Sequence, residues 1–155
     1  MLQVNDKAPT FTLPRDGGGD VSLEEFKGQW VILYFYPKDS TSGCTKQAID
    51  LTEHEAEFKK RDAVIIGISP DSAASHDKFI AKYDLNIILA ADEDRQAIES
   101  YEVWKEKKMY GRSYMGIERS TFLVDRDGTI KAIWRKVKVP GHAKMLLDKL
   151  DEENS

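Results

Sequence analysis

The first strong pattern in the chain is an apolar run that leads into a helical repeat. Every position from Trp30 to Tyr36 is apolar or aromatic, without the alternation of a half-buried strand, which indicates a strand buried on both faces. Pro37 ends this strand. Helical spacing follows and predicts a helix from about Gly43 to Lys60. The positions that set this spacing are Ala48, Leu51, Glu55 and Phe58.

The rest of the chain alternates strand patterns with helix patterns. Gly17-Gly18-Gly19-Asp20 predicts a tight turn between two short N-terminal strands. Strands are expected at Ala63–Ser69, Ile87–Ala90, Thr121–Asp125 and Thr129–Trp134. Helices are expected from Ser72 to about Tyr83, at about Asp94–Tyr101, and from about Pro140 or Gly141 to Leu150.

Two of these helices have a recognisable inward face. Ser72 is placed to cap the first of them. The predicted inward positions are Ala73, His76, Phe79, Ile80 and Tyr83 in that helix, and Met145, Leu146 and Leu150 in the last helix. Both helices are therefore expected to pack against the sheet.

The stretch Glu102–Glu118 is rich in lysine, glycine and aromatic residues and is interpreted as a loop. A loop of this length in a compact domain suggests a functional segment beside a site. Asp127-Gly128, by contrast, separates two strand patterns and is a strong hairpin signal. Strands that alternate with helices imply parallel pairs, and the hairpin adds an antiparallel strand. The pattern therefore predicts an α/β fold with a central mixed sheet flanked by helices.

Length and composition narrow the class of protein. With 155 residues and 41% hydrophobic content, residues 1–155 are expected to form a single domain. The formal net charge of −4 predicts neither a nucleic-acid partner nor a basic membrane-binding face. No apolar run approaches the roughly 18 residues that a spanning helix needs, and the N-terminus lacks a signal pattern. A cytoplasmic location is therefore expected.

Cys44 is the only cysteine and stands where the helix follows the strand. A thiol in the first turn of a helix lies among unpaired N–H groups at the positive end of the dipole, and both favour the nucleophilic thiolate. Thr41-Ser42-Gly43-Cys44 has the spacing of a Cys-x-x-Cys motif whose first cysteine is replaced by threonine. A dithiol centre and an internal disulfide are therefore excluded. The alternative is a small, buried and inert side chain.

Pro37-x-x-x-Thr41-x-x-Cys44 resembles the active-site signature of the peroxiredoxins, and its surroundings resemble the Q-type members, also called bacterioferritin comigratory proteins. Other blocks resemble the same family, in the expected order, from residue 5 to about residue 142. These blocks are Asn5–Leu13, Val64–Ser69 with Asp71, and Arg119–Asp125 preceded by Trp104, Gly111 and Gly116. The resemblance implies a thioredoxin-like fold with an insertion and an N-terminal hairpin extension.

The resemblance also implies a thiol-dependent peroxidase that reduces hydrogen peroxide and organic hydroperoxides. The implied catalytic residues are Cys44, Thr41, Arg119 and Pro37, and the supporting residues are Gln47 and Gly43. Cys44 would be the peroxidatic nucleophile and form a sulfenic acid. Arg119 would touch sulfur and peroxide with its planar fork, and Gln47 resembles a position that orients this arginine. Thr41 would offer its hydroxyl and also cap the helix, while Pro37 would shield the thiolate.

Two positions depart from the family pattern. Ser42 replaces the usual proline before the Gly-Cys pair, which loosens the turn and is expected to reduce activity rather than remove it. Ile49 stands where many Q-type members carry a resolving cysteine, and the helix from Ser72 to Tyr83 contains none either. The chain thus resembles a one-cysteine variant. Its sulfenic acid would be cleared by an external thiol from a glutathione, glutaredoxin or thioredoxin system.

The remaining features predict no further chemistry. No cofactor is implied, and the three histidines lack metal-ligand spacing, so no metal is expected. Lys105-Glu106-Lys107-Lys108 is interpreted as a solvated loop, and Trp104 and Tyr110 as walls of the pocket. A monomer or a weak homodimer is expected.

The alternative function is a non-enzymatic thioredoxin-fold redox sensor or holdase. A sensor needs thiolate character but little stabilisation of a leaving group. The presence of Arg119 together with Pro37, Thr41 and Cys44 therefore favours the enzyme.

Overall fold

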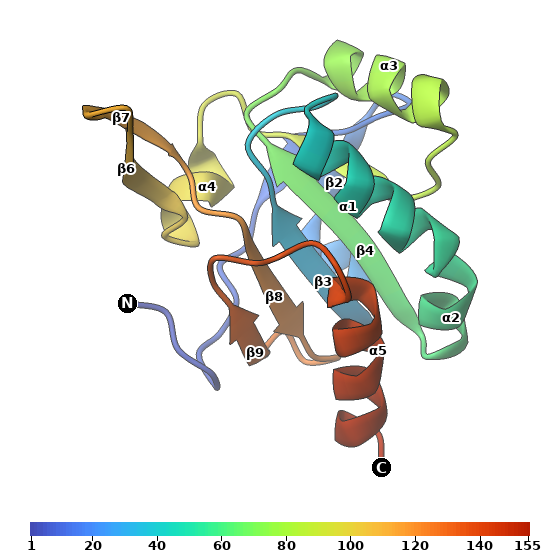
Figure 1. Ribbon diagram of the computed structural model, residues 1–155. Helices are drawn as coiled ribbons and strands as arrows, with labels where there is room; N and C mark the ends of the chain where they lie inside the picture. The colour runs from blue at the N-terminus through green and yellow to red at the C-terminus, as the bar shows by residue number, and fades with distance from the viewer.

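The computed structural model describes all of residues 1–155 and places a five-stranded sheet at the centre, in the order β5-β4-β3-β8-β9 (Figure 1). Its strands are β3 (Trp30–Phe35), β4 (Ala63–Ser69), β5 (Ile88–Ala91), β8 (Ser120–Val124) and β9 (Ile130–Trp134). The pairs β3–β4 and β4–β5 are parallel, whereas β3–β8 and β8–β9 are antiparallel. The predicted mixed sheet is confirmed.

Helices and the N-terminal segment cover the two faces of this sheet. One face carries α1 (Ser42–Glu53), α2 (Glu55–Lys60), α3 (Ala73–Tyr83) and α5 (His142–Glu153), which lie in front of the sheet in Figure 1. The other face carries the predicted N-terminal hairpin of β1 (Thr12–Pro14) and β2 (Asp20–Ser22), the short 3-10 helix η1 (Leu23–Phe26) and α4 (Gln96–Ser100). None of the helices is both long and apolar enough to span a bilayer.

Strand β3 separates two apolar cores because its side chains alternate between the faces. Ile32 and Tyr34 pack on the side of α1 and α5, whereas Leu33 and Phe35 pack on the side of the N-terminal hairpin and α4. All six residues of β3 are buried, as the run without alternation predicted. Helix α1 begins beyond the carboxyl end of this strand, the edge at which open α/β sheets usually hold their sites.

The helix predicted from about Gly43 to Lys60 is interrupted at His54. The His54 N–H is shared between the carbonyl oxygens of Asp50 and Leu51, at 3.3 and 3.2 Å. Its ring Nδ1 also lies 2.8 Å from the Asp50 carbonyl oxygen. Shared bonds of this kind are common where a helix ends. The prediction of one helix is therefore corrected to two short helices, α1 and α2.

The segment predicted as the loop Glu102–Glu118 contains a hairpin instead. Strand β6 (Trp104–Met109) pairs antiparallel with β7 (Arg112–Ile117), and the hairpin extends away from the central sheet (Figure 1). Both turn residues have positive φ, 53° at Tyr110 and 77° at Gly111, as a two-residue hairpin turn of the primed type requires. Most of β6 and β7 is exposed or half-buried on both faces, so these strands lack the apolar alternation that reveals a strand in a sequence.

The other predicted helices and strands are confirmed, with ends that differ by no more than three residues. Ser72 caps α3 as predicted, because its side chain accepts a hydrogen bond from the Ser75 N–H. The prediction of the inward face of α5 was partly wrong. Met145 is 50% exposed, and Leu147 is buried instead because it lies one turn after the buried Ala143.

Candidate active site

Cys44 lies in the first turn of α1, just beyond the carboxyl end of β3. Its side chain is 2% exposed and belongs to the core between α1 and the sheet. The thiol is free. The unpaired N–H groups of a first helical turn stabilise negative charge on an atom held there. The site therefore combines a nucleophilic sulfur with shielding from bulk water.

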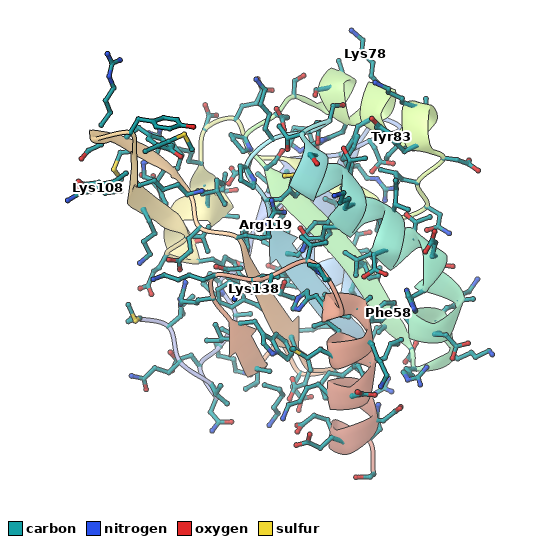
Figure 2. All side chains as sticks on the ribbon, viewed as in Figure 1. Phe58, Lys78, Tyr83, Lys108, Arg119 and Lys138 are labelled. Carbon is teal, nitrogen blue, oxygen red and sulfur yellow. The ribbon has the colours of Figure 1, made fainter.

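Arg119 holds its guanidinium against this sulfur. Its Nη2 donates to Cys44 Sγ at 3.3 Å, and its Nη1 donates to Gln47 Oε1 at 2.6 Å. Figure 2 shows Arg119 just before β8, next to α1. A Cβ on Gly43 would stand 3.3 Å from Arg119 Nη2, so glycine gives the guanidinium its close approach to the helix. Four of the predicted site residues, Cys44, Arg119, Gln47 and Gly43, therefore meet at one place.

Thr41 and Pro37 belong to the loop that joins β3 to α1. Thr41 occupies the N-cap position, but its side chain makes no capping bond to the helix. The hydroxyl instead donates to the carbonyl oxygen of Lys38 at 2.8 Å. The prediction that Thr41 caps α1 with its side chain is thus wrong, because the hydroxyl is directed at the Lys38 carbonyl and accepts no hydrogen bond from the N–H groups of α1. Pro37 is half-buried directly after β3.

A buried carboxylate fastens this loop. Asp39 accepts hydrogen bonds from the Tyr36 hydroxyl at 2.6 Å, from the Ser75 hydroxyl at 2.8 Å and from His76 Nδ1 at 2.7 Å. Burial raises the pKa of Asp39, but the bonds from His76, Tyr36 and Ser75 outweigh it and leave the pKa below its usual value. The backbone N–H of Asp39 also donates to the Asp71 carboxylate at 2.7 Å.

His76 is the charged partner of this carboxylate. Its Nδ1 faces Asp39, and its Nε2 lies 3.0 Å from the carbonyl oxygen of Ala90. Both partners only accept hydrogen bonds, so both ring nitrogens carry a hydrogen and the ring is an imidazolium. Burial lowers the pKa of His76. The hydrogen bonds and charge of its partners, the Asp39 carboxylate and the Ala90 carbonyl, outweigh burial, so the pKa lies above its usual value. The ion pair ties the loop before Cys44 to α3 and β5.

Sequence reasoning assigned no role to Asp39 or to the charge of His76. The one available signal was a histidine at an inward position of a helix whose other inward positions are apolar or aromatic. Neither residue makes a hydrogen bond to the sulfur, which accepts one from Arg119. Their contribution is to hold the loop from Pro37 to Thr41.

Tyr34 lies beneath the site. Its ring covers Gly67 so closely that a Cβ there would stand 2.6 Å from Tyr34 Cζ. Its hydroxyl is buried without a hydrogen-bond partner. Burial raises the pKa of Tyr34, and the charge of the Cys44 thiolate adds to this rise. Tyr34 therefore lies within electrostatic reach of the sulfur and remains neutral.

Three lysines line a groove of about 370 Å³ beside Arg119. Lys105 and Lys107 come from β6, and Lys136 follows β9. The other lining residues are Glu106, Glu118, Arg119 and Val137. Burial lowers the pKa of Lys107, and the charge of Arg119 lowers it further. The interpretation of this lysine cluster as a solvated loop is therefore corrected, because two of its members face the site from a strand.

The aromatic residues predicted to wall the pocket lie elsewhere. Tyr110 is 97% exposed at the tip of the hairpin. Trp104 packs against the core on the α4 side, with the Arg95 guanidinium 4.5 Å from its ring centroid. Both assignments were wrong, because the tip of the hairpin extends into solvent and Trp104 packs into the core on the other side of the sheet.

A second cavity of about 390 Å³ lies between the N-terminal segment and the opposite end of the sheet, next to Val31 and Val124. It contains no cysteine, and it is separated from Cys44 by the length of β3. No group of three or more His, Cys, Asp or Glu side chains is placed to share a metal ion.

The comparisons with known sequences all identify the same protein family. Residues 4–133 match the model of the AhpC/TSA family. The chain is 46% identical to peroxiredoxin Bcp of Bacillus subtilis over 151 residues, covering 97% of this chain and 96% of that protein. It is also 42% identical to peroxiredoxin Bcp of Escherichia coli K12, covering 97% of each.

Solved structures agree with the sequences. Peroxiredoxin Q of Xanthomonas campestris superposes with a TM-score of 0.89 at 43% identity, covering 94% of this chain and 92% of that one. A cysteine-to-serine mutant of PrxQ from Xylella fastidiosa gives 0.95 at 36% identity, covering 100% and 99%. A further structure concerns the alkyl peroxide reduction activity of the X. campestris bacterioferritin comigratory protein, with a TM-score of 0.89 at 43% identity and coverage of 94% and 92%. The predicted thioredoxin-like fold is confirmed by these neighbours.

Proposed function

The chain belongs to the AhpC/TSA family and is a one-cysteine thiol peroxidase of the peroxiredoxin Q type, and we propose that an external thiol resolves its Cys44 sulfenic acid. The proposal covers hydrogen peroxide and organic hydroperoxides as substrates. The observation that carries it is the contact of Arg119 Nη2 with Cys44 Sγ, together with the absence of a second cysteine. Alkyl peroxide reduction is also the activity named for the X. campestris relative.

In the first step the Cys44 thiolate attacks one peroxide oxygen. The S–O bond forms as the O–O bond breaks, and the departing hydroxide or alkoxide takes up a proton to give water or an alcohol. Negative charge moves from the sulfur to the leaving oxygen during this step, so donors aimed along that path lower the barrier. Cys44 becomes a sulfenic acid and is oxidised by two electrons, while the peroxide is reduced.

The residues around Cys44 have different roles in this step. Arg119 stabilises the thiolate and then the charge on the peroxide oxygens, and Gln47 fixes the plane of the guanidinium through Nη1. Thr41 gives its hydroxyl hydrogen to Lys38, so its oxygen lone pairs remain free to accept a hydrogen bond from a hydroperoxide O–H. Pro37 follows β3 directly and, having no N–H, adds no competing hydrogen-bond donor to the loop before Cys44.

In the second step an external thiol attacks the sulfenic sulfur. A mixed disulfide forms and water leaves, and a second thiol then releases reduced Cys44 and a small-molecule disulfide. Within the chain no second thiol can replace this outside thiol, because Cys44 is the only cysteine.

Oxidation without any thiol tests this proposal. We expect peroxide alone to convert Cys44 to the sulfenic acid and then to the sulfinic acid, because nothing in the chain traps the first product. Mass spectrometry of the intact protein should show the addition of one oxygen and then of two. With a glutathione, glutaredoxin or thioredoxin system offered separately, at least one should stop the second addition and sustain peroxide consumption.

A disulfide between two copies of Cys44 as the main product would contradict external resolution. The sulfur is recessed, with a side chain 2% exposed, so two copies cannot meet without opening α1. Failure of all three reducing systems to sustain turnover would contradict it as well.

The missing resolving cysteine also has a consequence for motion. Residues five apart on an α-helix are turned by about 140° and separated by roughly 7.5 Å along the axis, whereas a disulfide needs Cα atoms within about 6.8 Å. Relatives with a second cysteine at the position of Ile49 must therefore unwind this helix to close the bridge. Here Ile49 packs against the core. We expect the amides of Ala48–Leu51 to stay protected from hydrogen exchange in both the reduced and the thiol-adduct forms.

The matched control is the variant Ile49→Cys. Its oxidised form should lose protection over the same amides if bridge closure is what unwinds α1. Deprotection of the wild-type helix on oxidation would show that unwinding belongs to the scaffold and not to the second cysteine.

A further inference from the structure

The groove beside Arg119 has a charge opposite to that of the whole chain. Its lining carries four cationic side chains and two acidic ones, whereas the chain has a formal net charge of −4. The acidic residues are Glu106 and Glu118. Burial and the charge of Arg119 lower the pKa of Lys107, and the charges of Cys44 and Glu118 oppose this shift without cancelling it. Val137 is its one apolar residue. The groove is thus a local cationic site in an acidic protein.

The three lysines of the groove are not used by the fold. None of Lys105, Lys107 and Lys136 takes part in any ion pair or side-chain hydrogen bond of the structure, including with the neighbouring Glu106 and Glu118. Lys105 and Lys107 are two residues apart on β6 and so share one face of the hairpin. Lys108 belongs to the opposite face and does not line the groove.

The groove is fixed in place next to the reactive sulfur. The stem of Lys107 lies over Gly116, where a Cβ would stand 3.4 Å from Lys107 Cδ. The Val137 N–H donates to the Arg119 carbonyl oxygen at 2.9 Å, which holds the segment of Lys136 against the residue that contacts Cys44. In Figure 2 the exposed Lys108 lies on the hairpin, away from Arg119. Lys138, which belongs to the segment after β9, lies near Arg119 in the same view.

We propose that this groove binds the carboxylates of a small anionic thiol that resolves Cys44, and this inference rests on the external resolution proposed above. A volume of about 370 Å³ is within the range of small-molecule sites. The cationic lining selects carboxylates, and with only Val137 apolar it offers no channel for the alkyl tail of a lipid hydroperoxide. A peptide-sized polar thiol with two carboxylates, such as glutathione, matches both features.

The groove serves the thiol step as follows. The bound thiolate attacks the sulfenic sulfur of Cys44, the S–S bond forms, and the S–O bond breaks with release of water after protonation of the leaving hydroxide. A second molecule of the thiol then attacks the mixed disulfide, so Cys44 is reduced and two thiols are oxidised to one disulfide. The lysines form no covalent bond in either step. They act by binding the carboxylates of the thiol.

The test compares glutathione with its diethyl ester, which lacks both carboxylates. Stoichiometric peroxide first converts the protein to the sulfenic acid, and the rate of its reaction with each thiol is then measured and expressed per thiolate. We expect glutathione to react about five- to tenfold faster than the ester, because each exposed charge pair contributes a modest amount. The advantage should shrink as ionic strength rises.

The variant Lys107→Gln/Lys136→Gln should remove most of this advantage, and Lys108→Gln should keep it. Equal rates for the two thiols in the wild type, or the same loss in Lys108→Gln, would overturn the groove assignment while leaving external resolution intact. If no sulfenic acid forms, or if it reacts with neither thiol, the proposed function itself fails.

A separate arm compares linoleic acid hydroperoxide with its methyl ester in the peroxide step. A carboxylate preference confined to that step would reassign the groove to the peroxide substrate and overturn its assignment to the thiol.

Discussion

The variant Cys44→Ser is expected to lose peroxide turnover by more than about a thousandfold, as removal of a catalytic nucleophile does in other enzymes. Serine is nearly isosteric with cysteine, so the core around residue 44 should stay packed. Its hydroxyl has no accessible anion at neutral pH, and the charge of Arg119 cannot create one. The chain has no other cysteine that could take over the reaction.

Two measurements check this expectation. Peroxide consumption is followed with the reducing system that sustains the wild-type protein, and the thermal unfolding midpoint shows whether the variant is folded. A folded variant without turnover supports Cys44 as the nucleophile. Wild-type rates from the serine variant would end the peroxidase mechanism described above.

The place of the reactive sulfur could be predicted from sequence because neighbouring residues determine it. The run from Trp30 to Tyr36 contains no charged residue and is rich in β-branched and aromatic side chains, which indicates a strand buried on both faces. Pro37 stops the strand, and helical spacing resumes within a few residues. Cys44 had to lie at that junction, and the structure places it in the first turn of α1.

The contacts that complete the site could not be predicted in this way, because they join residues far apart in the chain. Arg119 is 75 positions from Cys44, and its assignment came from family resemblance rather than from periodicity. His76 is 37 positions from Asp39. The register of β3 with its neighbours and the approach of α3 determine these distances, and neither is encoded in a local pattern.

The hairpin β6–β7 illustrates a second limit. Strands are found in a sequence through burial, and this hairpin buries little on either face. Its turn, Tyr110-Gly111, also lacks the Asn-Gly or Asp-Gly signal that identified the later hairpin at Asp127-Gly128. The lysines of the groove were therefore interpreted as solvent-facing, since their strand was not recognised.

The variant Arg119→Lys is expected to slow the reaction of reduced protein with peroxide by about a hundredfold, the usual cost of losing one oriented donor at a developing charge. Lysine keeps the positive charge, so any loss reports geometry rather than charge. The guanidinium contacts Cys44 Sγ through Nη2 and Gln47 Oε1 through Nη1. A single ammonium group on a flexible stem cannot hold both contacts and also reach the peroxide.

The loss must appear in the second-order rate constant for peroxide, measured by rapid mixing of reduced protein with excess peroxide before any thiol is added. Arg126→Lys is the matched control, because Arg126 also makes two hydrogen bonds, to Gly28 and Asp62, but lies at the opposite end of β8. We expect this control to keep the wild-type rate constant. If Arg119→Lys instead slowed only the later reaction with thiol, the guanidinium would act in resolution. Its contact with Cys44 would then serve the sulfenic acid and not the attacking thiolate.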